Sequence, residues 1–274
     1  MVFGILVLGM DFEESIASIF AAGNHLPYLS LGNLIGNTII AIAISFGIPI
    51  LLLRPEIDEF PTMYYMLLVA TGLIVLLSTI LTTNLWILGL VLLFLFLFMV
   101  GFTLNYQRDY HAELVEREDE LREFNLIQFF KIIIFIVLMI VGGDILVNNA
   151  ESIIKITGIS ESFFGLILMA FITNVEEFWL MYKSTRKNQL ELGISTQIGK
   201  ILWNFTLIYG ISLLMINNYI ISLNLIISAV ICLIITIYLV IALYRKRLYK
   251  RDALVLLAIL IIFVAYNFYA EISL

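Results

Sequence analysis

The sequence is poor in the residues that build disulfides, soluble metal centres and most catalytic sites. It has one cysteine and two histidines in 274 residues, and only 13% of its residues are charged. The single cysteine, Cys232, excludes an intrachain disulfide, and no cluster of histidine and cysteine is available for zinc or copper. No nucleophile–base set, HExxH motif or phosphate-binding loop occurs, so we expect neither an enzyme nor a tightly bound cofactor. We expect no nucleic-acid partner, and the sequence does not indicate protein partners.

Hydrophobic residues are abundant instead, at 62% of the chain, and the mean hydropathy is +1.07. Alternating ten-residue segments of the kind that form membrane β-barrels are absent, so apolar runs of about 20 residues are expected to cross the bilayer as helices. The predicted fold class is therefore all-α, a polytopic membrane protein with about nine transmembrane helices. The predicted spans are 2–21, 28–53, 62–83, 85–105, 127–148, 162–183, 192–216, 219–244 and 252–272.

Basic residues in the loops predict the orientation of the chain. Thirteen of the 15 lysines and arginines fall on one side of the nine spans, while Lys155 falls on the other side and Lys200 lies within a span. Because basic residues concentrate in cytoplasmic loops, this distribution predicts a cytoplasmic N-terminus in an integral, plasma-membrane protein. The first span lacks the basic n-region and cleavage site of a removable signal peptide. The charged loop 106–126 is interpreted as a solvated helical linker.

The two halves of the chain repeat at a constant offset. This offset aligns the acidic pair at 13–14 with the pair at 176–177, and it also aligns the Ile-Gly pairs at 35–36 and 198–199. The matching helices are the first and the sixth, so they cross the bilayer in opposite directions, as in the inverted repeats of many transporters. We therefore expect a first repeat over 1–105, a cytoplasmic linker over 106–126 and a second repeat over 127–274. Asp144 is expected to cap or pack at the end of its helix.

Carboxylates at bilayer depth are the strongest functional signal. Each costs about 2.5–3.5 kcal/mol at the centre of a spanning helix, so these side chains must face one another, water or a cation. Helical spacing puts Glu177 on one face with Thr173 and Asn174, and Glu14 on one face with Asp11. Such an all-oxygen set suits a hard cation such as Ca²⁺ or Na⁺. The acidic residues at this depth are Asp11, Glu13, Glu14, Glu176 and Glu177.

These motifs resemble the cation/calcium exchanger superfamily, whose sodium/calcium exchangers carry two inverted repeats. The second half, "GGDILVNNAESIIKITGISESFFGLILMAFITNVEE", follows the family pattern most closely, and the first half retains its glutamate and a G-N-x-x-G element in "LGMDFEESIASIFAAGNHLPYLSLGNLIGNTI". The resemblance implies that Glu14 and Glu177 are the paired calcium ligands. It also implies that Asn33 and Thr173 contribute ligand oxygens, within an antiporter that works by alternating access.

Departures from the family pattern fall at positions that hold the coupling ion. Met10 and Asp11 replace a threonine and a serine, Asn174 replaces a serine, and Thr196 stands where a carboxylate or amide is expected. Lys200 replaces a serine. We expect its ammonium group to neutralise one acidic residue and to occupy the space of a sodium ion.

Two further departures leave alternatives open. Glu13 and Glu176 replace the family's prolines. They either line the ion path or lie on the other side of their helices, where they pair with Lys200 or with water. The family also has a helix before its first repeat that has no counterpart before Val2. The chain is then either shortened at its N-terminus or a nine-span variant.

Three functions fit these observations. The first is a secondary antiporter that exchanges Ca²⁺ for Na⁺, and the second is an H⁺-coupled exchanger of Ca²⁺ or another cation, which the extra carboxylates and Lys200 favour. In the third, a channel-like or non-transporting membrane protein, the acidic helices bind an ion structurally. In each case the bilayer and the ions are the predicted partners, and Ca²⁺ with Na⁺ or H⁺ are the transported ions in the first two.

Overall fold

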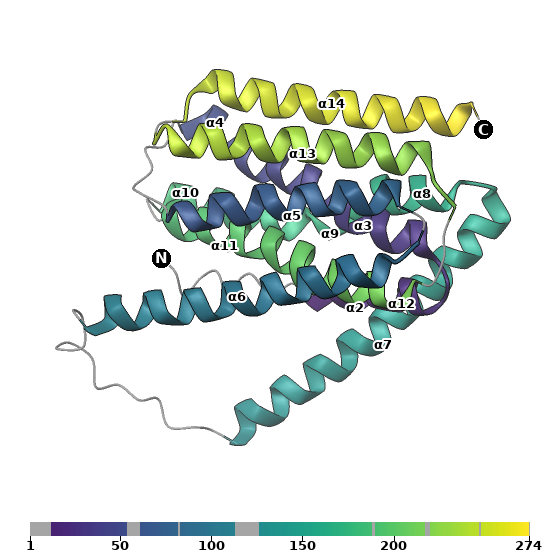
Figure 1. The fold of residues 1–274 in the computed structure, drawn as a ribbon, viewed down its shortest axis with the longest axis horizontal. Helices are drawn as coiled ribbons and strands as arrows, with labels where there is room; N and C mark the ends of the chain where they lie inside the picture. Colours follow the sequence, from purple (N-terminus) through teal and green to yellow (C-terminus); the bar gives the residue numbers. More distant parts are fainter. Residues whose placement is uncertain are drawn as a thin grey trace.

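A computed structural model describes residues 12–53, 61–81, 83–112, 126–187, 190–216, 220–246 and 248–273. Side chains at 107–112, 126–129, 131, 132, 176 and 190–192 lie outside this description. Within the described part the regular structure is entirely helical, as the sequence predicts (Figure 1). The helices are α2 (Phe12–Gly23), α3 (Pro27–Ile40), η1 (Ala41–Phe46), α4 (Gly47–Leu53), α5 (Thr62–Ile80), α6 (Leu85–Ala112), α7 (Leu126–Thr157), α8 (Glu161–Phe163), η2 (Phe164–Met169), α9 (Ala170–Thr173), α10 (Val175–Arg186), α11 (Leu190–Trp203), η3 (Asn204–Ile208), α12 (Tyr209–Met215), α13 (Leu223–Tyr244) and α14 (Lys250–Ile272).

Among the described residues, eight helices are long and apolar enough to cross a membrane. Three of the eight contain a π-helical segment: η1 lies between α3 and α4, η2 lies between α8 and α9, and η3 lies between α11 and α12. The remaining predicted span, 2–21, is described only as α2, because residues 1–11 lie outside the described part. The polytopic helical fold predicted from the sequence is confirmed. Of the predicted linker, 113–125 lies outside the description.

The internal repeat is visible in the helix boundaries. The offset that aligns Glu14 with Glu177 also superimposes both ends of α2 on those of α10, and both ends of α3 on those of α11. The same offset places the start of the π-helical segment η1 on the start of η3. The two halves therefore share their helix starts, their hairpin and the position of their π-helical segment, and they form the inverted duplication that the sequence predicts.

Close packing joins the halves where α3 crosses η2. A Cβ atom at Gly36 of α3 would lie 2.1 Å from the carbonyl oxygen of Leu166, and one at Gly165 of η2 would lie 2.7 Å from that of Leu29. Only glycine permits such a backbone approach, which is a common way of packing helices in membranes. Gly36 therefore serves the close packing of α3 against η2.

Helix α7 lies apart from the bundle for much of its length (Figure 1). It packs on α2 through Val147 and Ala150, which are buried against Ala17 and Ala21. The prediction that Asp144 caps or packs at a helix end is wrong: α7 continues to Thr157, so Asp144 lies inside the helix with an exposed side chain. The predicted span 127–148 ends earlier than α7, because hydropathy falls after residue 148 while residues that favour helix continue beyond it.

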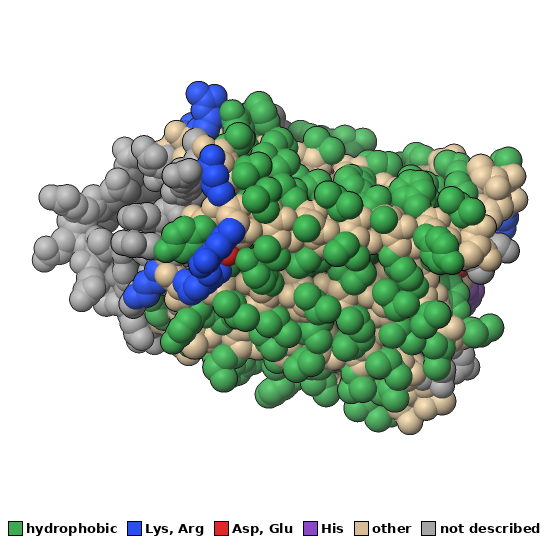
Figure 2. Space-filling model, turned by 90° about the horizontal axis from the view of Figure 1, so that it is seen from above, with side chains coloured by type: hydrophobic (Ala, Val, Ile, Leu, Met, Phe, Trp, Pro, Cys, Tyr) green, Lys and Arg blue, Asp and Glu red, His purple; other side chains and the backbone are tan. Residues whose placement is uncertain are grey.

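The surface is apolar along the spans and basic at one end. Figure 2 shows hydrophobic side chains over most of the visible face, with most of its lysines and arginines gathered at one end. The linked ends of α13 and α14 belong to this basic end, and there Asp252 is buried and accepts a 2.7 Å hydrogen bond from Arg245. The carboxylate of Asp252 also accepts hydrogen bonds from the Tyr238 hydroxyl and the Tyr249 backbone. These hydrogen bonds stabilise the turn between α13 and α14.

Candidate ion-binding site

The two candidate glutamates occupy equivalent places at two helix starts. Helix α9 ends at Thr173, Asn174 has φ −90° and ψ 0°, and α10 begins at Val175, so Glu177 lies in the first turn of a helix in a broken span. Glu14 lies in the first turn of α2. The partial positive charge of a helix N-terminus stabilises a carboxylate there, and transporter sites are commonly built from such discontinuous helices.

Lys200 joins these two carboxylates. Its Nζ lies 3.0 Å from Glu14 Oε1 and also donates a hydrogen bond to Glu177 Oε1. Glu14 is fully buried, and Glu177 and Lys200 are 6% and 4% exposed. The structure therefore brings the predicted pair together through an ammonium group. The sequence predicted that Lys200 would neutralise one acidic residue, whereas it contacts both.

Asn204 completes this cluster, and the sequence analysis missed it. Its Nδ2 donates a 2.8 Å hydrogen bond to Glu14 Oε2, so the carboxylate of Glu14 is held on both oxygens. Asn204 stands four residues after Lys200, which puts both side chains on one face of their span. That spacing was the available signal. The family motif ends near Lys200, so it does not include Asn204.

A layer of amides and hydroxyls surrounds the helix break. Asn37 Nδ2 donates to Thr173 Oγ1 at 3.1 Å, and Asn174 Nδ2 donates to the backbone oxygens of Ala170 and Asn37. Asn33 Nδ2 donates to Ser18 Oγ at 3.0 Å. The first repeat thus contacts the predicted ligands Thr173 and Asn174 of the second through Asn37, and the predicted ligand Asn33 lies one turn before Asn37 on α3. Because Asn37 and Lys200 occupy equivalent positions in the two repeats, the repeat itself could have identified Asn37.

Several buried amide oxygens near the cluster have no hydrogen-bond partner within the described part of the chain. They are the side-chain oxygens of Asn33, Asn174, Gln197 and Asn204. An unsatisfied buried acceptor costs about 1–3 kcal/mol, so such oxygens call for a water molecule or a cation. They extend the oxygen-rich surroundings of the glutamate pair, and oxygens are the ligands preferred by hard cations.

The other predicted site residues are distributed as follows. Thr196 is buried on α11. Glu13 is exposed on α2, so it lies on a different face of its helix from the buried Glu14. Asp11 and the side chain of Glu176 lie outside the described residues. In the described part, no group of three or more His, Cys, Asp or Glu side chains gathers to hold a metal ion.

The charge of the cluster defines what it can do. Glu14 and Glu177 carry two formal negative charges and Lys200 carries one positive charge, so a single unit of negative charge remains. A divalent cation that bound between the carboxylates would compete with the ammonium group for the same oxygens, Glu14 Oε1 and Glu177 Oε1. The cluster can therefore hold either the lysine ammonium or an added cation at that position.

Comparison with known proteins identifies similar families and structures. The sequence profile of a family described as "Sodium/calcium exchanger protein" matches residues 1–105 and 127–269. The uncharacterized membrane protein MJ0091 of Methanocaldococcus jannaschii is 25% identical over 198 residues, which are 71% of this chain. The match spans 63% of that relative, which is less than two thirds of its length.

Solved structures of the sodium-calcium exchanger NCX_Mj share the fold. One, soaked with 2.5 mM Na⁺ and 10 mM Sr²⁺, is 20% identical, with a TM-score of 0.65 over 96% of this chain and 86% of that chain. Another, soaked with 2.5 mM Na⁺ and 0.1 mM Ca²⁺, is 19% identical, with a TM-score of 0.67 over 96% and 85% of the two chains.

Proposed function

This chain belongs to the sodium/calcium exchanger family, and from that premise we propose that it exchanges Ca²⁺ for protons across the membrane, with Lys200 in place of a coupling sodium ion. The observation that supports this proposal is the position of the Lys200 ammonium, bonded to both Glu14 and Glu177. The ammonium group is a monovalent cation that is attached to the protein, and it loses its positive charge when it releases a proton. A sodium ion at that position would have to displace it.

Charge balance provides the coupling. With Ca²⁺ between Glu14 and Glu177, the ammonium group of Lys200 would be repelled by the divalent cation, and the lysine would release its proton. The loaded site would then carry two negative charges, one divalent cation and a neutral amine, with no net charge. When Ca²⁺ leaves, a proton taken up from the side of its release restores the ammonium, and this proton is carried back across the membrane. Each transported Ca²⁺ is thereby exchanged for at least one proton.

The remaining polar residues would complete the coordination of Ca²⁺. We propose that the side-chain oxygens of Asn33, Thr173 and Asn174 add to the two carboxylates, because Ca²⁺ takes six to eight oxygen ligands. Asn204 would hold Glu14 in place through its 2.8 Å hydrogen bond. Asp11, Thr196 and Glu176 would contribute to the ion path or to charge balance.

Alternating access would come from movement of peripheral helices against the paired repeats. We propose that α7 slides along α2, since most of its surface is exposed and its buried residues face α2. The other helices of the two repeats, which extend over 1–105 and 127–274, would remain the core that holds the site. The basic end in Figure 2 would face the cytoplasm of a plasma-membrane protein, together with the N-terminus.

Sodium coupling is the second candidate. The buried amide oxygens of Asn33, Asn174 and Gln197, which lack partners within the described part, are neutral ligands of a kind that suits Na⁺. In that case Lys200 would swing away from Glu14 and Glu177 during part of the cycle while Na⁺ ions occupy the carboxylates.

The two candidates separate in a flux measurement. Purified protein is reconstituted into sealed proteoliposomes, and the vesicles are loaded with radioactive calcium. Calcium efflux is followed under an imposed pH gradient and, separately, under an imposed Na⁺ gradient at constant pH. Proton coupling predicts efflux that follows the pH gradient and is unchanged by Na⁺. Efflux driven by Na⁺ alone would establish the second candidate. Calcium binding without flux under either gradient would indicate a non-transporting protein.

A further inference from the structure

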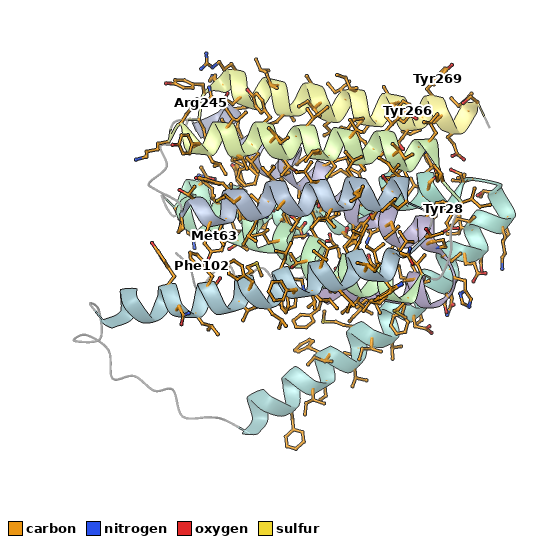
Figure 3. The ribbon with its side chains drawn as sticks, in the orientation of Figure 1. Tyr28, Met63, Phe102, Arg245, Tyr266 and Tyr269 are labelled. Atoms are coloured by element: carbon orange, nitrogen blue, oxygen red, sulfur yellow. The ribbon has the colours of Figure 1, made fainter. Side chains whose placement is uncertain are left out.

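A cavity lies at the end of the molecule opposite the linked ends of α13 and α14. It has a volume of about 630 Å³ and lies among the start of α3, the α8 region, the start of α13 and the end of α14. Figure 3 shows three of its tyrosines, Tyr28, Tyr266 and Tyr269, at this end, and Arg245 at the other. The cavity is therefore separate from the Glu14–Lys200–Glu177 cluster, none of whose three residues lines it.

One polar side chain in this cavity is buried without a partner. Asn224, in the first turn of α13, lines the cavity and is only 9% exposed. Neither its amide nitrogen nor its amide oxygen has a hydrogen-bond partner in the described part of the chain. Leaving a buried amide unsatisfied costs about 1–3 kcal/mol for each polar group. A ligand with a hydroxyl or amide group would satisfy both atoms.

The charge of the cavity wall selects the sign of the ligand. Glu161 lines the cavity, and its Oε1 accepts a 2.8 Å hydrogen bond from the backbone N–H of Leu29 at the start of α3. A carboxylate has about four lone-pair sites, so this helix-capping bond leaves capacity for a ligand. Among the residues that the structure describes, no lysine, arginine or histidine lines the cavity. The wall therefore favours a positive charge and disfavours an anion.

The size and the aromatic lining exclude a bare metal ion as the natural occupant. A volume of about 630 Å³ is in the range of small-molecule sites. The rings of Tyr28, Tyr266 and Tyr269 line it together with Ile221 and Ile227. Aromatic rings beside a carboxylate are the surroundings that bind alkylated ammonium ions, through cation–π attraction and contact with methyl groups.

We propose that this cavity binds a small alkylated ammonium ion that carries a second polar group, with the cation against Glu161 and the tyrosine rings and the polar group on Asn224. The trimethylammonium group combines these properties, and it occurs both in free amino alcohols and in the headgroup of phosphatidylcholine. The cavity borders the first repeat at α3 and the second repeat at α8. A bound ligand would therefore contact both halves of the proposed exchanger.

The test measures choline binding by calorimetry to the full chain in nanodiscs of phosphatidylglycerol, which lack trimethylammonium groups. The neutral isostere 3,3-dimethyl-1-butanol has the same shape without the charge. We expect choline to bind with a dissociation constant of about 1 mM or tighter, and the isostere to bind at least tenfold more weakly, about 1.4 kcal/mol. Equal binding of the two compounds, or no choline binding up to about 10 mM, would overturn the proposal.

Variants locate the site. Glu161→Gln and Asn224→Leu should each weaken choline binding about tenfold, while Asp144→Asn, which changes an exposed carboxylate on α7, should leave it unchanged. Because Glu161 also caps α3, Tyr266→Leu serves as a second variant of the cavity wall, with thermal unfolding as the check on folding. Wild-type affinity in all three cavity variants would contradict the assignment.

A second set of nanodiscs distinguishes the source of the ligand. If the headgroup of phosphatidylcholine also enters the cavity, nanodiscs of that lipid should weaken the apparent affinity for free choline. If only a free amino alcohol fits, the affinity should be the same in both lipids. Either result supports the proposed trimethylammonium chemistry and identifies where it comes from.

Discussion

The two repeats have the same backbone plan but unequal chemistry. Their helices start at equivalent residues, and Glu14 and Glu177 are equivalent. The helices that follow these glutamates differ: Asn37 in the first repeat corresponds to Lys200 in the second, and Ala41 corresponds to Asn204. The first repeat therefore supplies a carboxylate, while the second supplies a carboxylate, the ammonium group between the two and the amide that orients the first. The shared backbone plan gives the two glutamates equivalent positions, and the different residues at 37 and 200 give the two repeats different charges.

Removing the equivalent carboxylates should have the largest effect. We expect Glu14→Gln and Glu177→Gln each to reduce calcium flux in proteoliposomes to background, because each removes a ligand charge and leaves Lys200 with a weaker partner. The matched control is Glu13→Gln, which changes the adjacent but exposed residue. If Glu13→Gln abolishes flux and Glu14→Gln does not, the assignment of the two glutamates within the first repeat is reversed.

Replacing Lys200 by asparagine, the residue at the equivalent position of the first repeat, should change how calcium flux depends on protons. We expect Lys200→Asn to abolish the dependence of calcium flux on a pH gradient and to lower the free energy of unfolding by about 3–5 kcal/mol, because two buried carboxylates lose their shared cation. Flux under both gradients and thermal unfolding in detergent are the measurements. Unchanged proton dependence would exclude Lys200 as the coupling group.

The reciprocal exchange sharpens this test. In the double variant Asn37→Lys with Lys200→Asn, the ammonium group moves to the equivalent place in the other repeat. If pseudo-symmetry governs the site, the double variant should unfold at a higher temperature than Lys200→Asn alone. No recovery would show that the surroundings of Asn37, with its hydrogen bond to Thr173, no longer accept a charge.

Loss of the amide found only in the second repeat should have an intermediate effect. We expect Asn204→Ala to weaken calcium affinity by about 1–3 kcal/mol, roughly 5- to 150-fold, because Glu14 Oε2 loses its 2.8 Å hydrogen bond. The concentration of calcium that gives half-maximal flux is the readout, with the pH dependence retained. An unchanged half-maximal concentration would show that Asn204 does not position Glu14.

The smallest effect is expected where the two repeats only pack against each other and bind no ion. Gly36→Ala should lower the free energy of unfolding by about 1–3 kcal/mol, because the added methyl group meets the backbone of Leu166. Gly142→Ala, on α7 with nothing within 4 Å, is the control and should be neutral or slightly stabilising. Equal stability of both variants would show that α3 and η2 separate more easily than their packing indicates.

The sequence by itself determined the helical membrane fold, the inverted duplication and the proximity of Glu14 to Glu177, because hydropathy, helical period and repeat offset depend only on residue order. It did not determine where the ammonium group of Lys200 goes. The lysine side chain has a flexible four-carbon stem. Helical spacing therefore identifies the helix face that carries Lys200 but not the atoms that its ammonium group contacts.

Only the tertiary structure decided that this ammonium group bonds both carboxylates, that Asn204 holds Glu14, and that Asn224 lies unpaired within the described chain in a tyrosine-lined cavity. Each of these depends on how helices from different repeats approach one another. The helix break at Asn174 likewise could not be predicted, since no proline or glycine marks it. Such contacts arise from packing between segments far apart in the chain, which local patterns do not encode.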